Sequence, residues 1–70
     1  MMSREISIGA RRFWIVSEPD ATGWKAQVLE VVDAGGTTAP LHIETIGETR
    51  TLADDKALGQ LQLLLREESV

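Results

Sequence analysis

The segment Phe13-Trp14-Ile15-Val16 constrains the fold of this chain more than any other part of the sequence. All four residues are aromatic or β-branched, which favours an extended strand, and Pro19 follows as a residue that ends strands. Alternate side chains of a strand point to opposite faces of its sheet. A strand covered on one face only would therefore alternate apolar and polar residues. The run instead predicts a sheet with apolar side chains on both faces.

Similar patterns predict the other elements. The first strand is expected at residues 5–17, with Gly9 as an interruption or a bulge, because Ile6 and Ile8 alternate with a serine and lead into the apolar run. A second strand is expected at residues 24–32 and a third at 41–46. Turn-forming residues separate them, at 19–23 and in the glycine-containing loop 33–40.

The remainder of the chain predicts one helix over residues 52–67. Leu58, Leu61 and Leu65 recur at the helical period and form an apolar stripe. Thr51, with an aspartate three residues later, is the expected N-cap. Gly59 costs helix stability and is interpreted as a close-packing site. The fold class is thus α+β: one domain over residues 1–70, with a three-stranded antiparallel sheet and one C-terminal helix packed on one face.

Size and composition then predict self-association. The chain has 70 residues and no cysteine, which excludes disulfide scaffolds and thiolate metal sites. A domain of this size has a marginal core, and oligomerisation is a usual remedy. One helix covers only one sheet face, so we expect a homodimer that buries sheet surface including Trp14 or Trp24. The alternative is a twisted sheet with half-exposed tryptophans.

Four residues are candidates for the oligomer or partner interface: Trp14, Val16, Trp24 and Leu63. Leu63 lies off the main apolar stripe of the predicted helix, nearly opposite Leu61. It is either an exposed leucine without consequence or part of a second contact surface.

Charge and hydropathy exclude further classes. The formal net charge is −4, which argues against a general nucleic-acid binder. The longest uninterrupted apolar run has four residues, so we expect no membrane-spanning segment and no signal peptide. The expected location is the cytoplasm.

Two stretches resemble a known family. Residues 13–28 are similar to the opening hairpin of HicB-like antitoxins: an aromatic-rich strand, an acidic turn, then glycine-aromatic-x-Ala-x-Val. Residues 45–49, followed by Ala53, Ala57 and Leu61, resemble that family's Thr-x-Gly-Asp/Glu-Thr entry to a helix rich in alanine and leucine. The two stretches stand in the same order and at the same spacing as in the family.

The resemblance implies a small domain of the partial RNase H-like type that dimerises and acts by binding a small, RNA-cleaving toxin. The function expected from it is a non-enzymatic protein–protein interaction module. The chain differs from the family in two places. Residues 33–40 replace its usual Asp-Leu-Pro-Gly stretch, and Thr51 is the better candidate for the helix cap. No DNA-binding segment follows the helix in this sequence, so DNA binding is not expected.

The alternative function is a small metal-dependent nuclease or phosphoesterase with an RNase H-like arrangement. It would require carboxylates to converge on a metal, and the available ones are Glu18, Asp20, Glu30, Asp33 and Glu44. Glu18 and Asp20 are interpreted instead as turn residues. The only histidine, His42, is expected on a strand surface with Leu41 and Ile43 facing the other side. No catalytic, cofactor-binding or metal-binding residue is therefore assigned.

Positive charge is concentrated near the N-terminus, at Arg4, Arg11 and Arg12. These residues could bind an acidic partner or RNA phosphate, or could protect a strand edge from aggregation. Gly35 and Gly36 lack the lysine of a phosphate-binding loop and the spacing of a dinucleotide fingerprint, so they are expected to form a plain connection.

Overall fold

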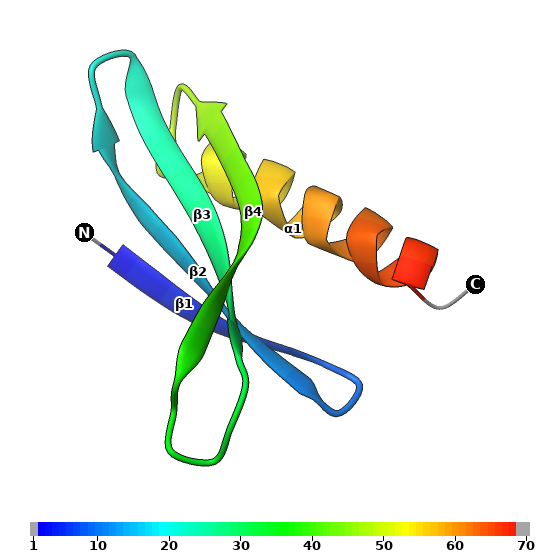
Figure 1. Ribbon diagram of the computed structural model, residues 1–70. Helices are drawn as coiled ribbons and strands as arrows, with labels where there is room; N and C mark the ends of the chain where they lie inside the picture. The colour runs from blue at the N-terminus through cyan, green and yellow to red at the C-terminus, as the bar shows by residue number, and fades with distance from the viewer. Residues whose placement is uncertain (1, 69–70) are drawn as a thin grey trace.

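The computed structural model describes residues 2–68, which form an antiparallel sheet with one helix across it (Figure 1). The elements in chain order are β1 (Met2–Ile8), β2 (Arg11–Asp20), β3 (Gly23–Val31), β4 (Thr38–Gly47) and α1 (Arg50–Glu68). The predicted α+β class, with a C-terminal helix packed on an antiparallel sheet, is confirmed. The helix packs against β2, β3 and β4.

The sheet has four strands and not three, because the predicted first strand folds back on itself. Residues 9 and 10 form a two-residue turn, and Ile8 pairs with Arg11 beside it. Gly9 has φ +62°, a left-handed conformation that costs glycine little. Glycine at the first central position is typical of the turn that suits the twist of a hairpin. The interruption expected at Gly9 is therefore a complete reversal of the chain.

The strands lie in the order β1-β2-β3-β4, each antiparallel to the next. In the central pair, Ile15 lies opposite Val28. The pairing of β3 with β4 is irregular between Gln27 and Leu29. Gln27 pairs with residue 44 and Leu29 with residue 40, so β4 carries a bulge at this point.

The core lies between α1 and the face of the sheet that it covers. Phe13, Ile15 and Val28 supply large buried side chains from the sheet, and Leu61 supplies the largest from the helix. The fully buried members are Phe13, Ile15, Ala26, Val28, Ala53, Ala57 and Leu61. Burial of this apolar surface, at about 25 cal/mol per Å², is the main stabilising contribution available to so small a chain.

The helix begins two residues before the predicted start. The backbone N–H of Leu52 donates to the Thr49 hydroxyl at 3.1 Å, which makes Thr49 the N-cap. The helix therefore starts at Arg50, and the prediction of Thr51 as the cap is wrong. An N-cap hydroxyl accepts from the backbone N–H three residues later. Both Thr49 and Thr51 stand three residues before such an N–H, so the sequence alone does not show which threonine caps the helix.

The apolar stripe of the helix is confirmed. Leu61 is buried, and Leu58 and Leu65 are half-buried against the core. Gly59 is not a close-packing site, since a Cβ built at this position meets nothing within 4 Å. Among residues 2–68, no helix is both long and apolar enough to cross a membrane.

Candidate functional site

One face of the sheet is left uncovered by the helix. Phe13 and Ile15 of β2 point to α1, so Trp14 and Val16 between them point to the opposite side. Trp14 lies opposite Leu29 of β3. We call this side the helix-free face.

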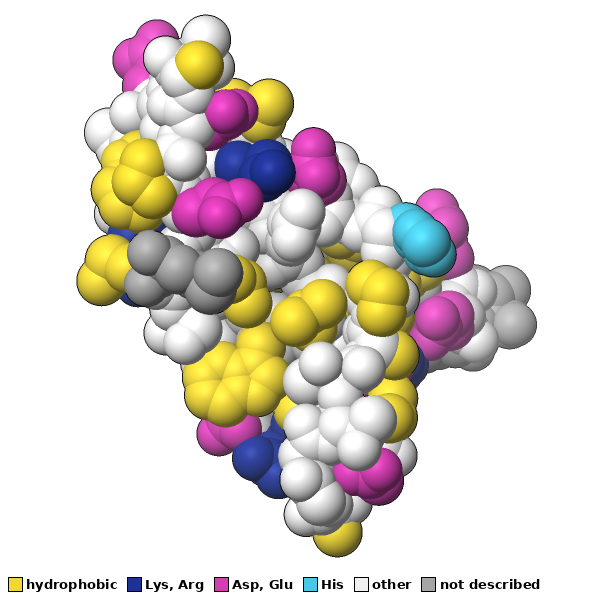
Figure 2. All heavy atoms as spheres, turned by 60° about the vertical axis from the view of Figure 1, so that its left-hand side comes forward, with side chains coloured by type: hydrophobic (Ala, Val, Ile, Leu, Met, Phe, Trp, Pro, Cys, Tyr) yellow, Lys and Arg dark blue, Asp and Glu magenta, His cyan; other side chains and the backbone are white. Residues whose placement is uncertain are grey.

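The helix-free face carries a continuous apolar strip across β2, β3 and β4. Its members are Trp14, Val16, Leu29, Val31 and Pro40, as the strand register places them. Pro40 is exposed and the other four are half-buried. Figure 2, which brings the side away from the helix forward, shows hydrophobic side chains gathered in the middle of this face. The strip is accessible to a partner.

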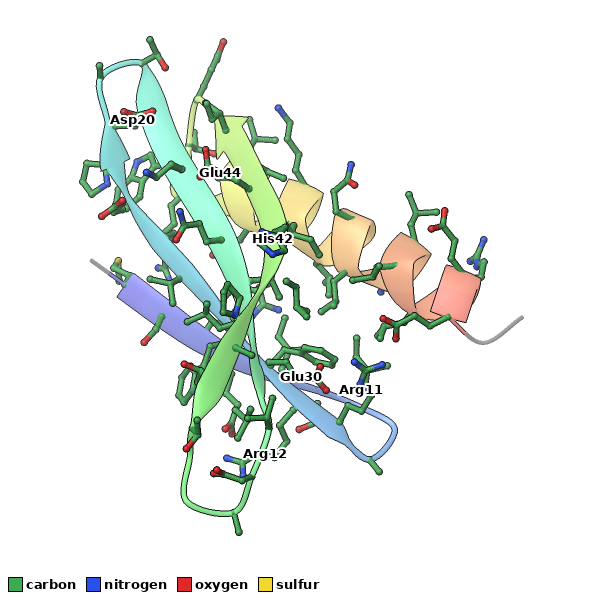
Figure 3. The ribbon with its side chains drawn as sticks, in the orientation of Figure 1. Arg11, Arg12, Asp20, Glu30, His42 and Glu44 are labelled. Atoms are coloured by element: carbon green, nitrogen blue, oxygen red, sulfur yellow. The ribbon has the colours of Figure 1, made fainter. Side chains whose placement is uncertain are left out.

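A hollow of about 440 Å³ lies beside the strip, where the bulge separates β3 from β4. Residues 27–29 line it from β3, and Pro40 and residues 42–44 line it from β4. His42 stands at this position with φ +59°, the left-handed conformation that a bulge can impose. Figure 3 shows His42 half-way along β4. The helix-free face is thus both apolar and concave. At protein interfaces, the side chains that contribute most to binding often fill pockets of this kind on the partner.

Charged pairs of opposite sign frame the apolar strip. Arg12 Nη2 lies 2.6 Å from Glu5 Oε2, and Lys25 Nζ lies 3.3 Å from Glu18 Oε1. The hydrogen bond from Lys25 to Glu18 raises the pKa of the lysine. Exposed pairs of this kind contribute little to stability. Their effect is to keep the rim of the face polar and close to neutral.

The structure separates the four predicted interface residues. Trp14 and Val16 share the helix-free face. Trp24 pairs with Pro19 and Gly47 and packs, half-buried, against the core on the helix side. Leu63 lies on the helix with 51% of its surface exposed. The two tryptophans therefore lie on opposite sides of the sheet.

The candidate carboxylates do not form a site among the described residues. Glu30 binds Arg11, Glu18 binds Lys25, and Asp20 accepts a hydrogen bond from the N–H of Ala21. Asp20 lies near one end of the β2–β3 hairpin and Glu30 well away from it (Figure 3). No group of three or more His, Cys, Asp or Glu residues that could hold a metal ion occurs within residues 2–68.

Asp33 orders the loop between β3 and β4. Its Oδ1 accepts a hydrogen bond from the Thr37 N–H at 3.0 Å, and this bond lowers the pKa of the carboxyl. The Val32 N–H also donates to the Thr37 carbonyl at 2.8 Å. These two hydrogen bonds close the loop that contains Gly35 and Gly36, which therefore serves to connect β3 and β4.

The N-terminal arginines do not act as one patch. Arg11 binds Glu30 on β3 and Glu68 at the end of α1, while Arg12 points to the helix-free face and binds Glu5. The Arg11 guanidinium also lies 5.4 Å from the centre of the Phe13 ring. Its hydrogen bonds to Glu30 and Glu68 raise its pKa. Two of the three arginines are thus paired with acids, one on each face.

His42 lies where the sequence predicts, exposed between Leu41 and Ile43, which are half-buried against the core. Its left-handed backbone and the hollow beside it were not predicted. Pro40 is the only local signal for them, because proline within a strand indicates an edge or a bulge.

A buried polar cluster under the start of α1 also went unpredicted. Ser17 and Asp54 are 1% and 5% exposed. Arg50 Nε lies 3.3 Å from the Ser17 hydroxyl and 3.7 Å from Asp54 Oδ2. Asp54 Oδ1 is buried without a hydrogen-bond partner. Asp54 stands between apolar positions of the helix, and sequence periodicity gives no signal for a buried carboxylate there.

Comparison of the chain with protein-family models, with curated proteins and with solved structures finds no match. The similarity to HicB-like antitoxin domains therefore stays a prediction that depends on the two quoted stretches.

Proposed function

We propose that this chain is a non-enzymatic protein–protein interaction module whose helix-free face binds a small protein. The observation that carries the proposal is the apolar strip from Trp14 to Pro40, which lies exposed or half-buried beside a hollow and inside a charged rim. The resemblance to HicB-like antitoxin domains supports a small toxin-like protein as the partner.

The anatomy of the face supports this function. Binding energy at protein interfaces is concentrated in a few central residues, among which tryptophan is enriched, with polar groups around them. Trp14 lies on the strip with Leu29 opposite it on β3 and the Arg12–Glu5 pair close by. A large side chain of the partner would enter the hollow that residues 27–29 of β3 line on one side and Pro40 and residues 42–44 of β4 line on the other.

The test is co-expression with the product of a short reading frame adjacent to the gene, followed by co-purification and calorimetry. Trp14→Ala is expected to weaken binding at least about 30-fold, which corresponds to the roughly 2 kcal/mol lost at a central interface residue. Leu63→Ala is the matched control, because it removes an exposed apolar side chain from the helix. Equal affinities of the two variants, or no complex with the adjacent product, would contradict the proposal.

A further inference from the structure

The two edges of the sheet differ in how well they could accept another strand. β4 forms one edge, and it is interrupted by Pro40 and by the bulge that holds His42 in a left-handed conformation. Such features prevent edge-to-edge pairing. β1 forms the other edge. It has seven residues, contains neither proline nor glycine, and pairs with β2 without a break from Met2 to Ile8.

The register shows which groups of β1 are free. Ile8 and Arg11 flank a two-residue turn, so they exchange both backbone hydrogen bonds. Bonded pairs alternate along an antiparallel ladder, which turns the N–H and C=O of residues 2, 4, 6 and 8 towards β2. The backbone groups of Ser3, Glu5 and Ser7 therefore point away from the sheet.

Nothing in the described part of the chain covers this edge. Within residues 2–68 the helix contacts β2, β3 and β4 but not β1 (Figure 1). Ile6 and Ile8 pack against the core from its margin and keep part of their surface exposed. A regular strand with unpaired backbone groups and partly exposed isoleucines is a template for another strand.

We propose that β1 pairs antiparallel with β1 of a second copy, so that two chains form one eight-stranded sheet. A two-fold interface needs a surface that is complementary to itself, and an antiparallel pair of identical strands meets that condition. The register centred on Glu5 uses all three outward residues, with Ser3 opposite Ser7 of the second copy. On the helix side it places Ile6 opposite Arg4 of the second copy.

Charge and size both favour a second copy at this edge. The register brings the two Glu5 side chains together, but each is already held at 2.6 Å by Arg12 of its own chain. The negative charges of the two Glu5 side chains, which would oppose strand pairing, are thus each neutralised within their own chain. A 70-residue chain without disulfides is also in the size range where association supplies missing stability.

This dimer goes beyond the proposed function and leaves its surface open. The two-fold axis is perpendicular to the sheet, so both helices lie on one side and both helix-free faces on the other. The sequence predicts a homodimer that buries sheet surface including Trp14 or Trp24, whereas edge pairing buries neither tryptophan and keeps the apolar strip available to a different protein.

The test is light scattering of the purified chain and of Ser7→Pro and Ser7→Ala variants. Proline at position 7 removes an outward N–H and leaves the bonds to β2 intact. We expect the wild type and Ser7→Ala to have about twice the 7.7 kDa mass of one chain, and Ser7→Pro to have the mass of one chain. Near-ultraviolet circular dichroism of the tryptophans checks that Ser7→Pro is folded. Should Ser7→Pro fail to fold, amide exchange of the wild type replaces it, with Ser3, Glu5 and Ser7 expected to be protected at high concentration and unprotected on dilution.

The outcomes separate the two proposals. A wild type that is monomeric at millimolar concentration, or a folded Ser7→Pro variant that stays dimeric, would overturn the edge dimer. A dimer lost in Trp14→Ala but kept in Ser7→Pro would place self-association on the helix-free face and overturn it as well. A monomer that binds the partner would leave the proposed function standing, and a dimer without a partner would leave only the edge dimer.

Discussion

The guanidinium of Arg11 and the carboxylate of Glu30 form a two-pronged ion pair across β2 and β3. Arg11 Nε donates to Glu30 Oε2 at 2.8 Å, and Nη2 donates to Oε1 at 2.7 Å. The remaining Nη1 donates to Glu68 at 2.7 Å, which connects the pair to the last turn of the helix. One arginine thus joins two strands and the far end of α1.

This arrangement predicts an effect of Glu30→Gln on stability that depends on pH. Arg11 lowers the pKa of Glu30 from its ordinary value of 4.5. A carboxyl whose pKa is lowered by folding stabilises the folded state at pH values above its unfolded-state pKa. This stabilisation is lost as the pH falls through the folded-state pKa. Because both side chains are partly exposed, we expect a loss of about 1 kcal/mol at pH 7. Urea denaturation at pH 7 and at pH 3 should show the difference shrinking in acid. Glu67→Gln, at an exposed helix position, is the control, and an equal loss there would contradict the assignment.

The N-cap predicts unequal effects of two neighbouring threonines. Thr49→Ala removes the acceptor for the Leu52 N–H and should reduce the free energy of unfolding by about 1 kcal/mol. Thr51→Ala lies inside the helix, where alanine is the better residue, and should be neutral or slightly stabilising. Thermal unfolding followed by circular dichroism distinguishes them. A greater loss in Thr51→Ala would restore the helix start expected from the sequence.

Two glycine-to-alanine changes should have opposite signs. Gly9→Ala places a side chain at φ +62° and should cost roughly 1 kcal/mol, weakening the β1–β2 hairpin. Gly59→Ala lies in the helix with open space around its Cβ and should stabilise by roughly 0.5–1 kcal/mol. Both are measured by urea denaturation. A destabilised Gly59→Ala variant would indicate a contact at that helix position.

Periodicity alone predicts the helix, its leucine stripe and the two central strands, because each contains a long regular pattern. It misses the reversal at Gly9. The turn contains no asparagine or aspartate to mark it, so Ile6, Ile8 and the apolar run that begins at Phe13 read as one strand.

The geometry of the candidate site depends on how the strands pair, and the sequence does not determine this register. Trp24 faces the helix because the turn at residues 21–22 sets Pro19 opposite it. The hollow depends on a bulge whose only local sign is Pro40.

The role assigned to Arg12 predicts how the edge dimer responds to charge. Arg12→Gln leaves Glu5 without its cation, so the two Glu5 side chains across the two-fold axis would repel each other. The dimer dissociation constant should rise about fivefold at low salt, as expected for the loss of roughly 1 kcal/mol of exposed ion pairing. Arg66→Gln is the matched control, because it changes the net charge equally from an exposed position on the helix.

The effect of Arg12→Gln should also depend on salt. At 1 M NaCl the screening length falls to about 3 Å, and the two variants should then dimerise with similar affinity. Concentration-dependent light scattering measures both conditions. Equal weakening by Arg66→Gln at low salt would trace the effect to overall net charge and away from the pairing of β1 with itself.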